Sequence, residues 1–228
     1  MPDFQGFEKT LTFLQDLSFN NKREWFQSQK PRYESDFITP ALSFIESMTP
    51  HIHAISPHFT AIAKKQGGSL MRIYRDTRFS KNRAPYKLNV GIHFRHDQGK
   101  DIHAPGLYVH IQPGNSFVGA GIWRPEPKTL RKIRDFIVDN PRSYKHAIQN
   151  KAFSESFHMS GDSLIRPPRG FDPEHALIEE LKRKDFIAIC HLSDAEVTKS
   201  SLPELAYQKL KVTEPLIGYL CTAIEANY

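Results

Sequence analysis

Hydrophobic residues recur every three to four positions near both ends of the chain and every second position in its middle. The first helical stripe consists of Phe7, Leu11, Leu14 and Leu17. This spacing predicts a helix with one buried face. Further helices are expected over residues 22–29 and 31–48, and Pro40 should kink or break the second because it lacks the N–H that the helix needs.

The period changes to two between residues 70 and 123. Apolar residues alternate there with polar residues or glycine in four runs, at residues 70–79, 88–94, 107–112 and 116–123. Such alternation is typical of strands with one apolar face. Because turn-prone residues separate the runs, the sequence predicts an antiparallel meander.

The helical period returns after Pro125. It covers residues 128–139, 144–157, 172–183 and 202–228, with Pro215 as a break in the last stretch and a short strand at 186–191. The predicted fold class is therefore α+β, an antiparallel sheet of four or more strands at about residues 70–123, packed with N-terminal and C-terminal helices. No internal repeat or linker is visible, so we expect one domain over 1–228, with N-terminal helices at 1–60, the central sheet at 65–124 and a helical part at 125–228.

Polar residues of the four runs should share the second face of the sheet if the apolar residues all pack on the helices. This face would carry Arg72, Tyr74, Asp76, Asn89, His93, Tyr108, His110, Gln112 and Trp123. Gly119 and Gly121 fall on the same face, where the lack of a side chain leaves room for a ligand. The pattern fits a ligand-binding floor, and it also fits a solvated outer face whose glycines allow twist or a bulge.

The run LMRIYRDTRFSKNRAPYKL at residues 70–88 concentrates the positive charge of the protein. Its six cations are Arg72, Arg75, Arg78, Lys81, Arg83 and Lys87, and Asp76 is its one acid, so it carries a net charge of +5 against +6 for the whole chain. Like charges about 4 Å apart repel by roughly 1 kcal/mol even in water. The run therefore needs carboxylates from elsewhere in the fold or an anionic ligand, and arginine provides the planar fork that holds phosphate or carboxylate.

We accordingly predict that the protein binds an anionic, phosphate-bearing small molecule or nucleotide, with hydrolytic or transferase chemistry as an option. The predicted ligand-binding residues are Arg72, Tyr74, Arg75, Arg78, Lys81, Tyr86, Lys87, His93 and Tyr108. Asp76 and His110 are the catalytic candidates, Asp76 as a base or as the group that orients a guanidinium. Structural ion pairs with acids of the flanking helices are the alternative for these arginines.

Other functions are less well supported by the sequence. Basic residues interleave with Tyr74, Phe79 and Tyr86, which could stack on bases, so a nucleic-acid-binding module is one alternative. A structural or protein-partner-binding role is another. His93, His110 and Asp76 could form a His/His/carboxylate set, but their spacing specifies no ion, and the prediction is no metal and no cofactor. The chain has no GxSxG, HExxH, kinase or Rossmann motif.

The composition of the chain indicates which classes of protein these predictions can apply to. The 228 residues are 39% hydrophobic and include 16 Phe, enough for a sizeable core. No run of about eighteen apolar residues occurs, so no membrane partner is expected. The first residues, MPDFQGFEKT, lack the layout of a secretion signal. Cys190 and Cys221 lie in apolar surroundings, as buried thiols of a reduced compartment do. We expect a cytoplasmic protein, and the sequence leaves its oligomeric state open.

The segment RIYRDTRFSKNRAPYK at residues 72–87 resembles the signature of the family catalogued as Domain of Unknown Function 2461, an uncharacterised bacterial and fungal family whose pattern runs RIYRDTRFSKDKTPYK. The resemblance extends to Asn20-Asn21, Glu24-Trp25-Phe26, Tyr33, Pro105-Gly106, Tyr108 and Gly121 through Glu126. The sequence departs from the pattern at Asn82, Arg83 and Ala84, so an acid at the first of these positions cannot be a required catalyst if Asn82 serves there. The resemblance implies one shared fold and no established activity.

Overall fold

The computed structural model describes residues 3–78, 83–98 and 104–228. Its centre is a six-stranded antiparallel sheet in the order β1-β2-β3-β4-β6-β5. The strands are β1 Phe59–Thr60, β2 Val90–His96, β3 Gly106–Ile111, β4 Ser116–Ile122, β5 His158–Ser160 and β6 Phe186–Leu192. The predicted α+β class with an antiparallel sheet and flanking helices is confirmed.

The helices before the sheet are α1 Glu8–Phe19, α2 Arg23–Ser28, α3 Lys30–Arg32, the π-helical segment η1 Tyr33–Ile38, and α4 Thr39–Ile55. The break predicted at Pro40 takes the form of this wider π-helical turn. The N–H of Thr39 bonds to the carbonyl of Glu34, five residues back, and Pro40 then lies at the start of α4. A proline in the first turn loses no helical hydrogen bond, so the chain continues as helix with a bulge.

The helices after β4 are α5 Pro127–Asp139, α6 Pro141–Gln149, α7 Lys151–Ser156, α8 Ile178–Leu181, α9 Asp194–Val197, α10 Leu202–Lys211 and α11 Glu214–Ala223. The helix predicted over residues 172–183 is wrong for its first half. The Asp172 carboxylate accepts the N–H of Glu174 at 2.9 Å, and its carbonyl accepts the N–H of His175 at 3.1 Å. These bonds close a local turn that competes with helix, which begins only at Ile178. No described helix has both the length and the hydropathy needed to cross a lipid bilayer.

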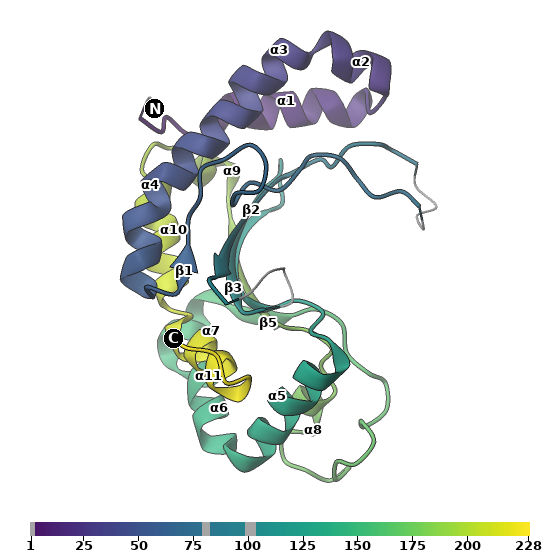
Figure 1. Ribbon diagram of the computed structural model, residues 1–228, viewed down its shortest axis with the longest axis vertical. Coiled ribbons are helices and arrows are strands. Elements are labelled where there is room, and N and C mark those ends of the chain that lie inside the picture. The colour runs from purple at the N-terminus through teal and green to yellow at the C-terminus, as the bar shows by residue number, and fades with distance from the viewer. Residues whose placement is uncertain (1–2, 79–82, 99–103) are drawn as a thin grey trace.

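The two faces of the sheet differ in what lies against them (Figure 1). Helices α4, α10 and α11 pack on one face, which we call the covered face. Its side chains include Val90, Ile92, Phe94, Leu107, Val109, Ile111, Val118 and Ile122, all with 0% exposure. The opposite face, which we call the open face, looks toward the right of Figure 1, between the N-terminal helices above and α5 and α8 below. The predicted alternation of the strands is thus confirmed for β2, β3 and β4.

The strand predicted over residues 70–79 is not a regular strand in the part of it that the structure describes. Leu70 and Tyr74 form only isolated bridges, to Ile92 and Tyr86. The chain instead runs out and back as an irregular hairpin, which we call the basic arm (residues 70–78 and 83–88). Its backbone bonds include Arg75 N–H to the Pro85 carbonyl at 2.9 Å. Pro85 has no N–H to donate in return, which limits a continuous ladder.

The sheet therefore differs from the predicted four-strand meander. Of the four predicted strands, the last three form β2, β3 and β4 of the sheet, β1 pairs with the outer side of β2, and β6 takes the place beside β4. The strand predicted at 186–191 is confirmed, while β5, directly after the helical stretch predicted over 144–157, was not predicted. The strand predicted over residues 88–94 ends too early, because β2 continues to His96 and pairs Arg95 with Gly106.

Candidate functional site

A pocket of about 520 Å³ lies on the open face, which is within the usual range of small-molecule sites. Strands β2, β3, β4 and β6 provide most of its lining. The side chains are Met71, His93, Tyr108, His110, Phe117, Trp123, Ile187, Ile189 and His191, with Gly106, Gly119 and Gly121 between them. Three of the predicted site residues, His93, Tyr108 and His110, are brought together here.

The strand register arranges this face in three rows across the sheet. One row runs from His93 through Tyr108 and Gly119 to Ile189, a second from Gly91 through His110 and Phe117 to His191, and a third from Arg95 through Gly106 and Gly121 to Ile187. Directly paired residues of antiparallel strands have Cβ atoms about 5 Å apart. Imidazole, phenol and phenyl rings therefore stand next to positions that carry no side chain.

Two of these glycines make room for the protein's own side chains. A Cβ at Gly91 would lie 2.7 Å from the Tyr108 hydroxyl, and one at Gly106 would lie 2.3 Å from Nε2 of His93. At Gly121 the backbone itself requires glycine, with φ +131° and a Cβ position 1.9 Å from the Phe186 carbonyl. Of the glycines on this floor, Gly119 fits best the expectation that a missing side chain leaves space for a ligand, since its closest neighbour would be 3.2 Å away.

Tyr108 and His110 form a hydrogen-bonded pair in the pocket. Nε2 of His110 donates to the side-chain oxygen of Gln112 at 2.9 Å, so Nδ1 is free to accept the Tyr108 hydroxyl at 3.3 Å. Burial raises the pKa of Tyr108 to about 12. Burial also lowers the pKa of His110, with the bond to Gln112 opposing this effect and the charge of Lys87 adding to it. Both groups are therefore neutral near pH 7, and the imidazole is stacked on Phe117 at 4.6 Å between ring centroids.

Cations border this neutral lining. Burial lowers the pKa of Lys87, and the neighbouring charge of Arg72 lowers it further. Among the residues that the structure describes, no carboxylate lies within ion-pair distance of Arg72, Arg75 or Lys87. The alternative prediction, that helix acids neutralise these arginines, is not met for Arg72 and Arg75 within that part of the chain.

Arg95 is a cation of the open face that sequence reasoning missed. Its Nε is buried and finds no hydrogen-bond partner among the described residues. Its place in the third row puts it beside Gly106, a lining residue of the pocket. The signal was present, because Gly91, His93 and Arg95 continue the alternation of the strand by two residues more than we predicted.

In the outer part of the basic arm, unlike at the pocket, a cation is paired with a carboxylate. Asp76 pairs with Arg78 at 2.7 Å, and the Arg78 side chain is 77% exposed. Hydrogen bonds from Arg78 lower the pKa of Asp76 to about 2, so this carboxylate is a weak base at neutral pH. Asp76 lies outside the pocket lining, and its predicted catalytic role gains no support from this position. Lys81 lies outside the described residues.

The base of the arm is held by the N-terminal helices. The buried ring of Tyr86 stacks on Phe26 at 4.0 Å, and half-exposed Tyr74 packs against Tyr86 at 5.3 Å between ring centroids. Either Asn20 or Asn21 could have capped the next helix from the sequence, but the N-cap residue of α2 is Lys22. The side chain of Asn21 instead donates to the Tyr86 carbonyl at 3.0 Å and accepts the Tyr86 N–H at 3.1 Å. Tyr86, a predicted ligand-binding residue, is thus placed in the packing between arm and helices.

The family model described as "Conserved hypothetical protein (DUF2461)" matches residues 9–219. The chain belongs to this family. No curated protein and no solved structure matches it. The match spans both parts of this DUF2461 chain that matter for the site, the basic arm and the strands beneath the pocket.

The His93/His110/Asp76 metal set considered from the sequence does not form in this DUF2461 protein. Within the described ranges, ligand-type atoms of three residues lie within 4.8 Å of one another at His58, His96 and Asp97 instead. His96 and Asp97 lie at the end of β2, and His96 belongs to the covered face, so this group is separate from the pocket lining.

Proposed function

We propose that the protein binds a small phosphate-bearing molecule of the nucleotide class in the pocket of the open face. The observation that carries the proposal is the combination of an aromatic, glycine-floored pocket with bordering cations that have no carboxylate partner among the described residues. Ligand sites commonly combine a largely apolar lining with a few placed polar groups.

The lining suits a planar ring. The rings of Phe117 and Trp123 line the pocket beside Gly119, and one face of Phe117 is already stacked on His110, so a nucleobase would stack against the remaining aromatic surface. Tyr108 and His110 stay neutral near pH 7, so they can form hydrogen bonds to such a ring without adding charge. Stacking of a base on an aromatic side chain contributes about 1–3 kcal/mol.

The phosphate end would lie against the cations. Lys87 and Arg72 are close to one another, and Lys87 is near His110, so a phosphate there would relieve the repulsion that lowers the pKa of Lys87. Arg95 offers a second contact, because a buried N–H without a partner is costly and gains from an acceptor.

Isothermal titration calorimetry with adenosine diphosphate, adenosine and inorganic phosphate tests this proposal. We expect the diphosphate to bind at least about tenfold more tightly than either fragment, since base and phosphate contacts add. Lys87→Gln and Arg95→Gln should each weaken it about tenfold, as expected for a charge-assisted contact. Lys151→Gln is the matched control, since Lys151 is 88% exposed on α7 and its loss removes the same charge.

The outcomes separate the alternatives. Failure of all three compounds to bind the wild-type protein, or equal loss in Lys87→Gln and Lys151→Gln, would overturn the proposal. Tight binding of single-stranded oligonucleotides, with affinity that falls steeply with salt through counterion release, would favour a nucleic-acid module in its place.

A further inference from the structure

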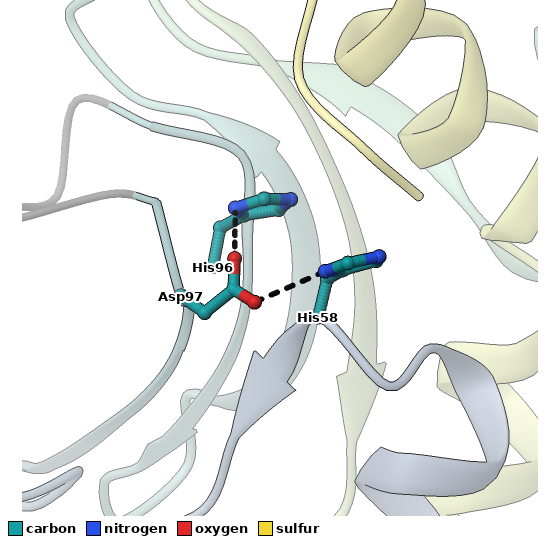
Figure 2. A group of neighbouring side chains, drawn as sticks. All are labelled: His58, His96 and Asp97. Carbon is teal, nitrogen blue, oxygen red and sulfur yellow. Dashed lines mark hydrogen bonds and ion pairs between the residues drawn. The ribbon is translucent and has the colours of Figure 1, made fainter.

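His58, His96 and Asp97 meet at the edge of the sheet where β1 and β2 pair (Figure 2). His58 directly precedes β1, His96 is the last residue of β2, and Asp97 follows it. The backbone fixes their separation, because Asp97 N–H donates to the His58 carbonyl at 2.7 Å and Phe59 pairs with His96. Both imidazoles face the same carboxylate from rigid strand ends.

The distances within this group resemble those between ligands of one metal ion. Nδ1 of His58 is 3.0 Å from one carboxylate oxygen of Asp97, and Nδ1 of His96 is 3.2 Å from the other. Two ligand atoms at about 2.0–2.1 Å from one ion are about 2.9–3.4 Å apart at octahedral to tetrahedral angles. The third spacing, between the two imidazoles, is within 4.8 Å.

A hydrogen bond to the C-terminal tail determines which ring nitrogen of His96 carries a proton. Nε2 of His96 lies 2.6 Å from the carbonyl oxygen of Asn227, so this nitrogen donates and Nδ1 carries the acceptor lone pair. That lone pair accepts the Gln98 N–H at 3.1 Å and lies 3.2 Å from the Asp97 carboxylate. A cation between this lone pair and the carboxylate would bind both, and it would replace the Gln98 N–H as the partner of Nδ1. Donation of the other ring N–H to a backbone carbonyl is also the usual support of a metal-binding histidine.

We propose that His58, His96 and Asp97 bind a divalent first-row transition ion of the Zn²⁺ type. Two imidazoles and one carboxylate suit such ions and suit Mg²⁺ or Ca²⁺ poorly. The His96 side chain is 1% exposed, whereas the side chains of His58 and Asp97 are 29% and 44% exposed. Rotation of the accessible His58 ring brings its nitrogen to the ion, and water completes the coordination from the exposed side.

The ion would also fix the C-terminal tail. The His96 ring links the site to Asn227, and Tyr228 packs near Phe59 at 6.5 Å between ring centroids. Metal binding makes the His96 N–H a stronger donor, so the tail should be held more firmly when the ion is bound.

The experiment is titration of the untagged, metal-free protein with Zn²⁺ by calorimetry, and with Co²⁺ by visible absorption. We expect one equivalent to bind with micromolar affinity or tighter. His58→Gln and Asp97→Asn change accessible side chains and should each weaken binding at least tenfold. His53→Gln removes an exposed histidine of α4 and should leave binding unchanged.

Truncation after Ala226 supplies a second measurement, because it removes the carbonyl that orients His96 while leaving all three ligands in place. Zn²⁺ affinity should fall several-fold, and the thermal stabilisation by Zn²⁺ should shrink with it. Absence of binding to the wild-type protein, or equal affinity in wild-type, His58→Gln and Asp97→Asn proteins, would overturn the proposal. A stronger response to Mg²⁺ than to Zn²⁺ would also contradict it.

Discussion

The two faces of the sheet use the same strands for different chemistry. Ile92 and Phe94 point to the covered face with no exposed surface, while Gly91, His93 and Arg95 alternate with them on the open face. A shift of one residue along a strand therefore moves a position from core to pocket. Core packing is therefore concentrated on one face, and the pocket of the proposed function lies on the other; each prediction below is a way to break or sharpen that division.

Phe94→Ala should have the largest effect on stability. Phe94 is fully buried on the covered face, and its truncation should cost about 3–5 kcal/mol of unfolding free energy. Phe117→Ala, on the open face, removes a stacking partner of His110 and should cost only about 1 kcal/mol. Urea denaturation of the two variants measures the difference. Equal losses would mean that the open face is as much part of the core as the covered face.

This division could be predicted from the sequence for three strands. Alternation in residues 88–94, 107–112 and 116–123 assigned His93, Tyr108 and His110 to one face, and the structure agrees. Such a pattern depends only on local geometry, which is why it could be found without knowledge of strand order. The place of β6 beside β4 joins segments far apart in the chain, and no periodicity records that pairing.

The basic arm shows a second reason why the sequence-based prediction of the sheet was incomplete. Its residues alternate like a strand, but Pro85 and the isolated bridges leave it outside the regular sheet. Charge density drew attention to Arg78 and Asp76, which pair with each other at the surface, while the single cation Arg95 escaped notice because the predicted strand ended at residue 94. Charge counts locate a cluster, whereas burial decides which cation of the protein is costly without a ligand.

Asn21→Ala tests how much the attachment of the basic arm to the N-terminal helices contributes to the stability of the fold. The side chain of Asn21 forms two hydrogen bonds with the backbone of Tyr86, and both are lost in the variant. We expect destabilisation of about 1–3 kcal/mol, because the Tyr86 N–H and carbonyl lose their partners. Chemical denaturation gives the value, and hydrogen exchange at the base of the arm should rise. Asn20→Ala, one residue earlier, is the control and should cost less.

His110→Gln should alter how the stability of the protein depends on pH more than it alters the stability at neutral pH. Burial lowers the pKa of His110 below the usual 6.5, so the unfolded chain takes up a proton at a higher pH than the folded protein does. The wild-type protein should therefore lose stability as pH falls below about 6.5, and the variant should lose less. Melting temperatures at pH 7.5, 6.5 and 5.5 measure this, with His53→Gln as the control. A steeper acid loss in His110→Gln than in the wild type would contradict the buried, neutral imidazole.

Asp76→Asn should have the smallest effect, because its pair with Arg78 lies at the solvent-exposed surface of the arm. Exposed pairs stabilise little, so we expect the melting temperature at pH 7 to change by no more than about 2 °C, and less in high salt. Hydrogen bonds from Arg78 lower the pKa of Asp76 from 3.8 to about 2. Any stabilisation is therefore complete above pH 3.8 and is lost as pH falls through 2, where the wild type and the variant should converge. Thermal unfolding between pH 7 and pH 2 measures this convergence. A large loss at pH 7 would show that the outer arm supports the fold, and the division between a stabilising covered face and a recognition surface would then not extend to the arm.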